Sequence, residues 1–105
     1  MWTSHVDVAV MAPPEYVQVA VQEAFVANGL SPRWWSATEG RAVGALCSFE
    51  FEILTAPGCT ILRLHKRIPG LAFGLGESTV RFKQITNWVC ARFQAQGLLI
   101  GVSGR

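Results

Sequence analysis

The side chains that could do chemistry concentrate between residues 50 and 67 of this 105-residue chain. Glu50 and His65 are of the types that transfer protons, and Arg63 and Arg67 are of the type that holds anions. Alternate residues of a β-strand point to the same face, so Arg63, His65 and Arg67 would share one face of a strand. In a closed pocket, Glu50 and His65 would be a candidate proton-transfer pair. On an open sheet, the three basic side chains would instead be a candidate site for an acidic ligand.

Two adjacent tryptophans, Trp34 and Trp35, could add a stacking surface to these basic side chains. Because neighbouring strand residues point to opposite faces, only one of them can enter the core, and the other should emerge on the open face. Sheets that read RNA usually present two or three aromatic side chains. Glu50 and Glu52 also cancel much of the positive field, so the sequence disfavours nucleic acid as a partner.

The strands that carry the basic side chains are predicted from the turn signal at Pro57 and Gly58. With these two residues at the centre of a hairpin turn, every pair of facing residues is fixed. The register places Ala56 opposite Cys59, Ile53 opposite Leu62, Phe51 opposite Leu64, Glu52 opposite Arg63 and Glu50 opposite His65. A slip of one residue would place glutamates against leucines, so charge pairing and apolar pairing select the same register.

A second candidate site is the glycine-rich segment at residues 70–77, before the second predicted helix. Gly74 and Gly76 would let backbone N–H groups approach an anion, and Ser78 is predicted as the N-cap of a helix that ends at Gly97. The segment lacks the lysine of a phosphate-binding loop, and Glu77 would repel an anion. Two interpretations therefore stand beside each other, an anion cradle and a set of glycines that permit a turn.

The chain also carries more apolar residues than a small domain must leave exposed. Two valines fall on the polar side of the first predicted helix. Phe73 and its neighbours in the glycine-rich segment would either contact a partner or cover the end of the core. The candidate interface residues are Val19 and Val26 in the first helix, Leu71 and Leu75 in the glycine-rich segment, and Leu99 and Ile100 near the C-terminal end.

The pattern of elements predicts an α+β fold, a two-layer sandwich in which two helices cover one face of a mainly antiparallel sheet of four to five strands. A turn is predicted at Glu39 and Gly40, and the last apolar segment is either an edge strand or a segment donated to a neighbouring subunit. The predicted order is a strand at residues 5–11, a helix closed by Gly29, a short strand at 33–37, a hairpin of strands at 43–54 and 59–68, a helix from Ser78 to Gly97, and the last segment at 98–102.

The composition supports one globular domain over residues 1–105, because 50% of the residues are hydrophobic and only 15% are charged. The net charge of +2 is far below that of a dedicated nucleic-acid binder. Three cysteines without a CxxC motif indicate neither a disulfide framework nor a metal site, and no motif indicates a cofactor. Without an apolar stretch of about 18 residues or a signal-peptide pattern, we expect a cytoplasmic protein that does not enter the membrane.

Charge is unevenly distributed along the chain. Residues 1–62 carry two basic and six acidic residues, whereas residues 63–105 carry seven basic residues and one acidic residue. This asymmetry could steer an acidic partner, or it could join two subunits, acidic surface to basic surface. Alternatively, folding interleaves the two halves, as the predicted hairpin already does.

Three functions follow from these candidate sites. The first is a non-catalytic protein-interaction or oligomerisation module, an accessory or regulatory protein whose partner is a second copy of itself or another protein. The second is a domain that binds a small acidic ligand, such as phosphate or a nucleotide, through the glycine-rich segment. The third is a small enzyme with Glu50 and His65 in a closed pocket. The first is favoured, because apolar residues are in excess and no familiar catalytic motif occurs in the sequence.

Overall fold

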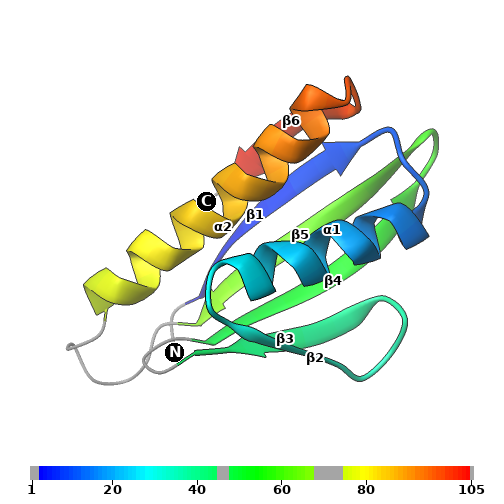
Figure 1. The fold of residues 1–105 in the computed structure, drawn as a ribbon. Helices are drawn as coiled ribbons and strands as arrows, with labels where there is room; N and C mark the ends of the chain where they lie inside the picture. The colour runs from blue at the N-terminus through cyan, green and yellow to red at the C-terminus, as the bar shows by residue number, and fades with distance from the viewer. Residues whose placement is uncertain (1–2, 45–47, 68–74, 105) are drawn as a thin grey trace.

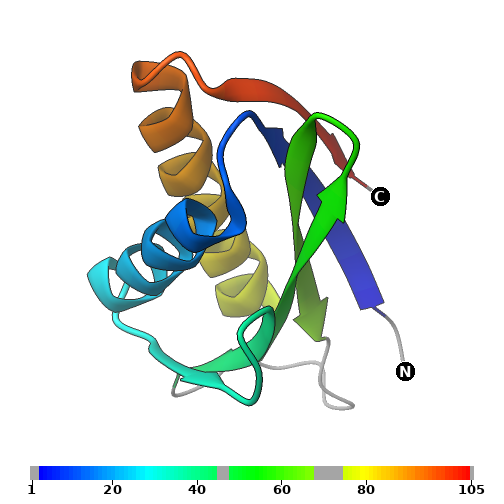
Figure 2. The ribbon, with the colours of Figure 1, turned by 90° about the vertical axis from the view of Figure 1, so that its right-hand side faces the viewer.

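The computed structural model describes residues 3–44, 48–67 and 75–104, and the side chains of residues 5–44, 48–66 and 80–104. Figure 1 shows two helices on one side of a sheet, and Figure 2 shows the same two layers after a quarter turn. The predicted α+β class, with both helices on one face, is confirmed. The elements are β1 (Thr3–Val10), α1 (Pro14–Ala27), β2 (Ser31–Trp34), β3 (Glu39–Val43), β4 (Ser48–Ala56), β5 (Cys59–Arg67), α2 (Leu75–Ala95) and β6 (Leu99–Gly104).

The six strands form one antiparallel sheet in the order β2-β3-β4-β5-β1-β6. The predicted count of four to five strands is wrong, because the alternating run at residues 43–54 is not a single strand. β3 ends at Val43 and β4 begins at Ser48. The alternation of residue types continues across this break, so periodicity alone gives no sign of it.

The turn predicted at Glu39 and Gly40 is also wrong, since both residues belong to β3 and the turn lies at residues 35–38. Gly40 is needed for close packing. A Cβ atom at this position would collide with the carbonyl oxygen of Arg33 and with Cζ of Phe51. Glycine within a strand often marks such a close approach of neighbouring groups.

The β4–β5 hairpin has the predicted register. The described pairs run from Phe49 opposite Lys66 to Ala56 opposite Cys59. Gly58 has a φ of +78°, the positive value that a type II turn requires after a proline. β1 lies along the other side of β5, so the hairpin is joined to the N-terminal strand by a second ladder.

The core lies between the helices and the sheet. Phe51 and Leu64 point into it, as the alternation predicted. Burying one side chain of this size stabilises the fold by about 1.5–3 kcal/mol, so the apolar face outweighs any single ion pair. The largest fully buried side chains are Val8, Val10, Phe49, Phe51, Leu62 and Leu64 from the sheet, and Val17, Val21, Phe25, Ile85, Val89 and Phe93 from the helices.

α2 begins at Leu75, three residues before the predicted N-cap, and ends near Gly97 as predicted. Gly76 and Ser78 therefore belong to the first turn of the helix, and the prediction of Ser78 as N-cap is wrong. Gly97 has a φ of +71°, and the N–H of Leu98 donates to the carbonyl of Phe93, which is a common way to end a helix.

β6 is an edge strand, paired antiparallel with β1 of the same chain. Of the two predicted alternatives, an edge strand and a segment donated to a neighbouring subunit, the structure has the edge strand. The register between β1 and β6 shifts once, at Ala9 and Val10, and leaves Ile100 without a facing residue. Among the described residues, no helix is both long and apolar enough to span a membrane.

Candidate functional site

The face of the sheet opposite the helices carries two rows of polar side chains, which cross the strands. Residues that face each other in an antiparallel ladder point to the same side, so each row lies on one face. Arg63 and His65 lie in these rows, as predicted. One row is Glu39, Glu52, Arg63 and Asp7, and the other is Arg33, Arg41, Glu50, His65 and His5.

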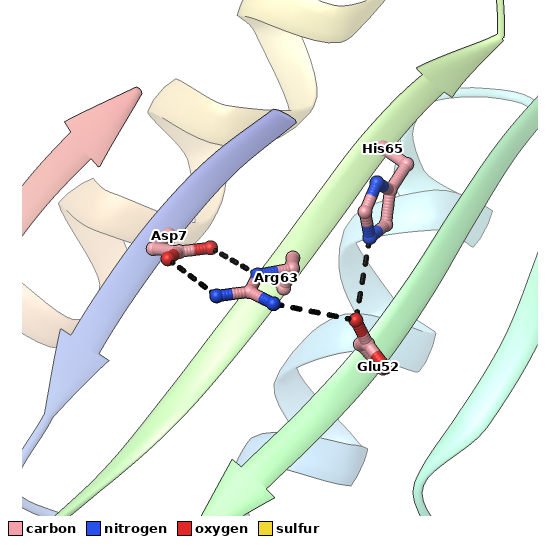
Figure 3. A network of polar contacts seen from close by, with 4 residues as sticks. All are labelled: Asp7, Glu52, Arg63 and His65. Carbon is pink, nitrogen blue, oxygen red and sulfur yellow. Dashed lines mark hydrogen bonds and ion pairs between the residues drawn. The ribbon is translucent and has the colours of Figure 1, made fainter. Parts of the chain in front are cut away.

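Arg63 is the centre of an ion-pair network on this face. Its guanidinium donates to both carboxylate oxygens of Asp7, from Nε at 2.8 Å and from Nη2 at 3.0 Å. Its Nη1 lies 3.8 Å from Oε1 of Glu52, and the same oxygen lies 3.4 Å from Nε2 of His65 (Figure 3). The charge of Arg63 is therefore already compensated within the protein.

The network changes the acid–base properties of its members. The hydrogen bonds from Arg63 hold the pKa of Asp7 below its ordinary value of 3.8, although partial burial acts in the opposite direction. The same bonds raise the pKa of Arg63 above its ordinary value. Both ions are thus held in their charged forms, which is typical of a structural ion pair.

The predicted proton-transfer pair does not form a hydrogen bond. Glu50 and His65 face each other in the ladder, as predicted. However, the partner of Nε2 of His65 is Glu52, and Glu50 accepts a hydrogen bond of 3.0 Å from Nη2 of Arg41. The ring of His65 also lies beside the ring of His5, with 5.6 Å between their centroids.

The two tryptophans separate as predicted. Trp34 points to the helix side. Its ring packs edge-on against the ring of Phe51, with 4.7 Å between the ring centroids, and its indole N–H donates a hydrogen bond of 2.9 Å to Oε1 of Gln22 in α1. Trp35 points to the open face and is 58% exposed. It borders two hollows on that face, one lined by glutamates and His65 and the other by Arg33, Arg41 and Val43.

Arg33 and Arg41 are site residues that the sequence did not reveal. They face each other across the β2–β3 pair. Their juxtaposition depends on a hairpin turn at residues 35–38, whereas the sequence predicted a strand over part of that stretch. The polar residues Ser36 and Thr38 are the signal that could have placed the turn, and the backbone N–H of Thr38 donates to Oγ of Ser36.

A groove lies along α1, beside the β2–β3 turn, with a volume of about 540 Å³. Val19 lines it, and Val26 is exposed farther along the same helix, so both predicted interface valines are at the surface. The residues that line the groove are Gln18, Val19, Gln22, Glu23, Trp34, Ser36 and Ala37.

The structure describes only part of the glycine-rich segment. Leu71, Phe73 and Gly74 lie outside the described residues. Leu75, Gly76 and Ser78 are placed in α2 by their backbone, and Arg67 is placed in β5 opposite Thr3. The binding and interface roles predicted for these residues remain predictions.

At the other end of the sheet, Leu99 packs against the core, whereas Ile100 and Val102 of β6 are exposed. Elsewhere the described cysteines, Cys59 and Cys90, are free thiols, and burial raises the pKa of Cys90. Within residues 5–44, 48–66 and 80–104, no group of three His, Cys, Asp or Glu side chains is arranged to hold a metal ion.

No known protein family and no curated protein matches this sequence.

Proposed function

We propose that this chain is a non-catalytic interaction module that forms a homodimer by pairing β6 of one copy with β6 of a second copy. The composition of that edge supports the proposal. β6 contains no charged residue and no proline, and its Ile100 and Val102 are 54% and 49% exposed. Soluble proteins usually protect an edge strand with charge, proline or short length, so an unprotected apolar edge is suited to pairing with another strand.

The opposite edge of the same sheet provides a comparison. β2 has four residues, and these include Pro32 and Arg33. Proline removes a backbone donor, a charge disfavours burial, and a short strand offers few hydrogen bonds, so this edge is protected in three ways. The contrast between the two edges favours an interface at β6.

A second copy of the chain fits β6 because an antiparallel pair of identical strands about a two-fold axis is self-complementary. β6 has no charge, so two copies would place no like charges opposite each other. Gly101, Val102, Ser103 and Gly104 pair regularly with β1, and the register shift affects only the start of the strand. The regular part offers its outward N–H and C=O groups to the partner, and the two sheets would become continuous.

The open face supports binding rather than catalysis. Asp7, Arg63, Glu52 and His65 bind one another, which is how charged groups stabilise a sheet surface. The hollow that contains Glu50 and His65 lies on this uncovered face, whereas proton-transfer enzymes usually exclude water from the reacting groups. A module of this kind would act as an accessory or regulatory protein through the assembly that it forms.

Light scattering after size-exclusion chromatography tests the proposal. At micromolar concentration, the wild type should have twice the monomer mass of 11.5 kDa. Val102→Lys should be a monomer, because it places a charge in the middle of the paired edge and two like charges near the axis. Val26→Lys is the matched control and also tests the interface predicted at Val26. Val26 is 58% exposed at the end of α1 that leads into β2, the opposite edge of the sheet from β6, and this variant should remain a dimer.

Circular dichroism should show that both variants keep the wild-type fold. A wild-type monomer at micromolar concentration would contradict the proposal. A folded Val102→Lys variant that dimerises as well as the wild type would contradict it equally, because the interface would then lie elsewhere.

A further inference from the structure

Two arginines on the open face have more hydrogen-bond donors than the protein uses. Arg33 and Arg41 face each other across β2 and β3, an arrangement of like charges that destabilises a sheet unless it is compensated. Arg41 is paired with Glu50 at 3.0 Å through one nitrogen, Nη2. Its Nε is buried without a hydrogen-bond partner. Arg33 has no ion-pair partner among the described residues, so one positive charge remains uncompensated at this point.

Apolar walls complete the site. Trp35 and Val43 line the same hollow as the two arginines, and its volume is about 370 Å³. This volume lies near the lower end of the range of small-molecule sites, which is roughly 300–1,000 Å³. An exposed indole beside two guanidinium groups offers a stacking surface and a charge in the same place.

The other side of Trp35 sets the orientation of a ligand. There the indole borders a hollow of about 260 Å³ lined by Glu39, Glu50 and Glu52. Glu50 and Glu52 are paired with cations, but Glu39 has no ion pair among the described residues and repels an anion, whereas Arg33 on the other side attracts one. A ligand with a ring and an acidic group would therefore stack its ring on Trp35 and direct the acidic group to Arg33 and Arg41.

We infer that the hollow between Trp35, Arg33 and Arg41 binds a small aromatic anion, a planar ring that carries one carboxylate or phosphate group. A bidentate contact between a guanidinium and such a group is the strongest recognition that these side chains offer. The site lies at β2 and β3, at the opposite edge of the sheet from β6, so it is independent of the proposed dimer.

A titration followed by ¹H–¹⁵N NMR tests the site with three probes. These are 1-naphthoate, which has a ring and a charge, 1-naphthylmethanol, which has the ring alone, and inorganic phosphate, which has the charge alone. With 1-naphthoate, the indole N–H of Trp35 and the backbone amides of Arg33, Arg41 and Val43 should shift and saturate. The other two probes should bind at least about tenfold more weakly, because each lacks one of the two interactions.

Two variants test which side chains contribute to the affinity for naphthoate. Arg33→Gln removes the uncompensated charge without breaking an ion pair, and it should weaken naphthoate binding about tenfold. Trp35→Ala should weaken it by a similar factor. Lys83→Gln on the exposed surface of α2 removes the same charge on the other side of the sheet, and it should leave the affinity unchanged.

Equal affinity for the naphthoate and for the alcohol would overturn the inference, because the arginines would then play no part. Shifts centred on the α1 groove rather than on Trp35 would also overturn it. So would naphthoate binding that Lys83→Gln weakens as much as Arg33→Gln does, since only the net charge of the protein would then matter.

Discussion

Arg63 of β5 and Asp7 of β1 form a two-pronged ion pair across the middle of the sheet, with N–O distances of 2.8 and 3.0 Å. The pair joins the β4–β5 hairpin to the N-terminal strand, which in turn holds β6. A contact between residues far apart in the sequence thus reinforces the ladder that joins the hairpin to the strand beside β6.

Asp7→Asn should destabilise the fold by about 1 kcal/mol, because it replaces a charge-assisted contact at a half-buried position with a neutral one. Urea unfolding at neutral pH measures the change. Glu39→Gln is the control on the same face, since Glu39 faces Glu52 and removal of its charge relieves a repulsion. If the two variants lost the same unfolding free energy, the ion pair between Arg63 and Asp7 would not stabilise the fold.

The contribution of Asp7 to stability should depend on pH. Because the folded pKa of Asp7 lies below its ordinary value of 3.8, the contribution is fully present above that value and is lost as the pH falls through the folded pKa. The difference in unfolding free energy between the wild type and Asp7→Asn should therefore be constant near neutrality and shrink in acid. Urea unfolding between about pH 6 and about pH 2 measures it. A difference that grows in acid would contradict the assignment.

Gly40→Ala should destabilise the fold by about 1–3 kcal/mol, because the new methyl group would collide with the backbone of Arg33 and the ring of Phe51. Gly101→Ala is the control, since a Cβ there would meet no atom within 4 Å. Because Gly101 lies on the proposed dimer edge, both glycine changes are made in the Val102→Lys chain. Thermal unfolding of both variants at one protein concentration makes the comparison. If Gly40→Ala is as stable as Gly101→Ala, Phe51 does not pack over the glycine as described.

The two tryptophans should respond differently to truncation. Trp34→Ala should cost about 2 kcal/mol, because it removes the contact with Phe51 and the hydrogen bond to Gln22. Trp35→Ala should change the unfolding free energy by less than about 0.5 kcal/mol, since its side chain is mostly exposed. Urea unfolding of the two variants gives the answer. A larger loss in Trp35→Ala would reverse the assignment of the two faces.

The parts of the fold that the sequence predicted correctly are those where two independent signals agree. In the β4–β5 hairpin, charge pairing of Glu52 with Arg63 and apolar pairing of Phe51 with Leu64 select one register, and the structure has that register. The tryptophan pair was also predictable, because adjacent strand residues must point to opposite faces.

Other features depend on long-range packing and were not predictable from local patterns. Gly40 resembles a turn residue, but the carbonyl oxygen of Arg33 and the ring of Phe51 are what require a glycine there. Arg33 and Arg41 can be predicted to face each other only if the turn at residues 35–38 and the separation of β3 from β4 are known. The start of α2 was misplaced because Ser78 is a good N-cap by type, although the helix already begins at Leu75.

The role of β6 as the dimer edge is tested most directly by amide hydrogen exchange measured at low and at high protein concentration. If two β6 strands pair, the outward-pointing amides of β6 become hydrogen-bonded, and their protection should rise with concentration, while β2 should not change. Exchange in β6 that is the same at a concentration where light scattering shows a monomer and at one where it shows a dimer would contradict the proposed interface.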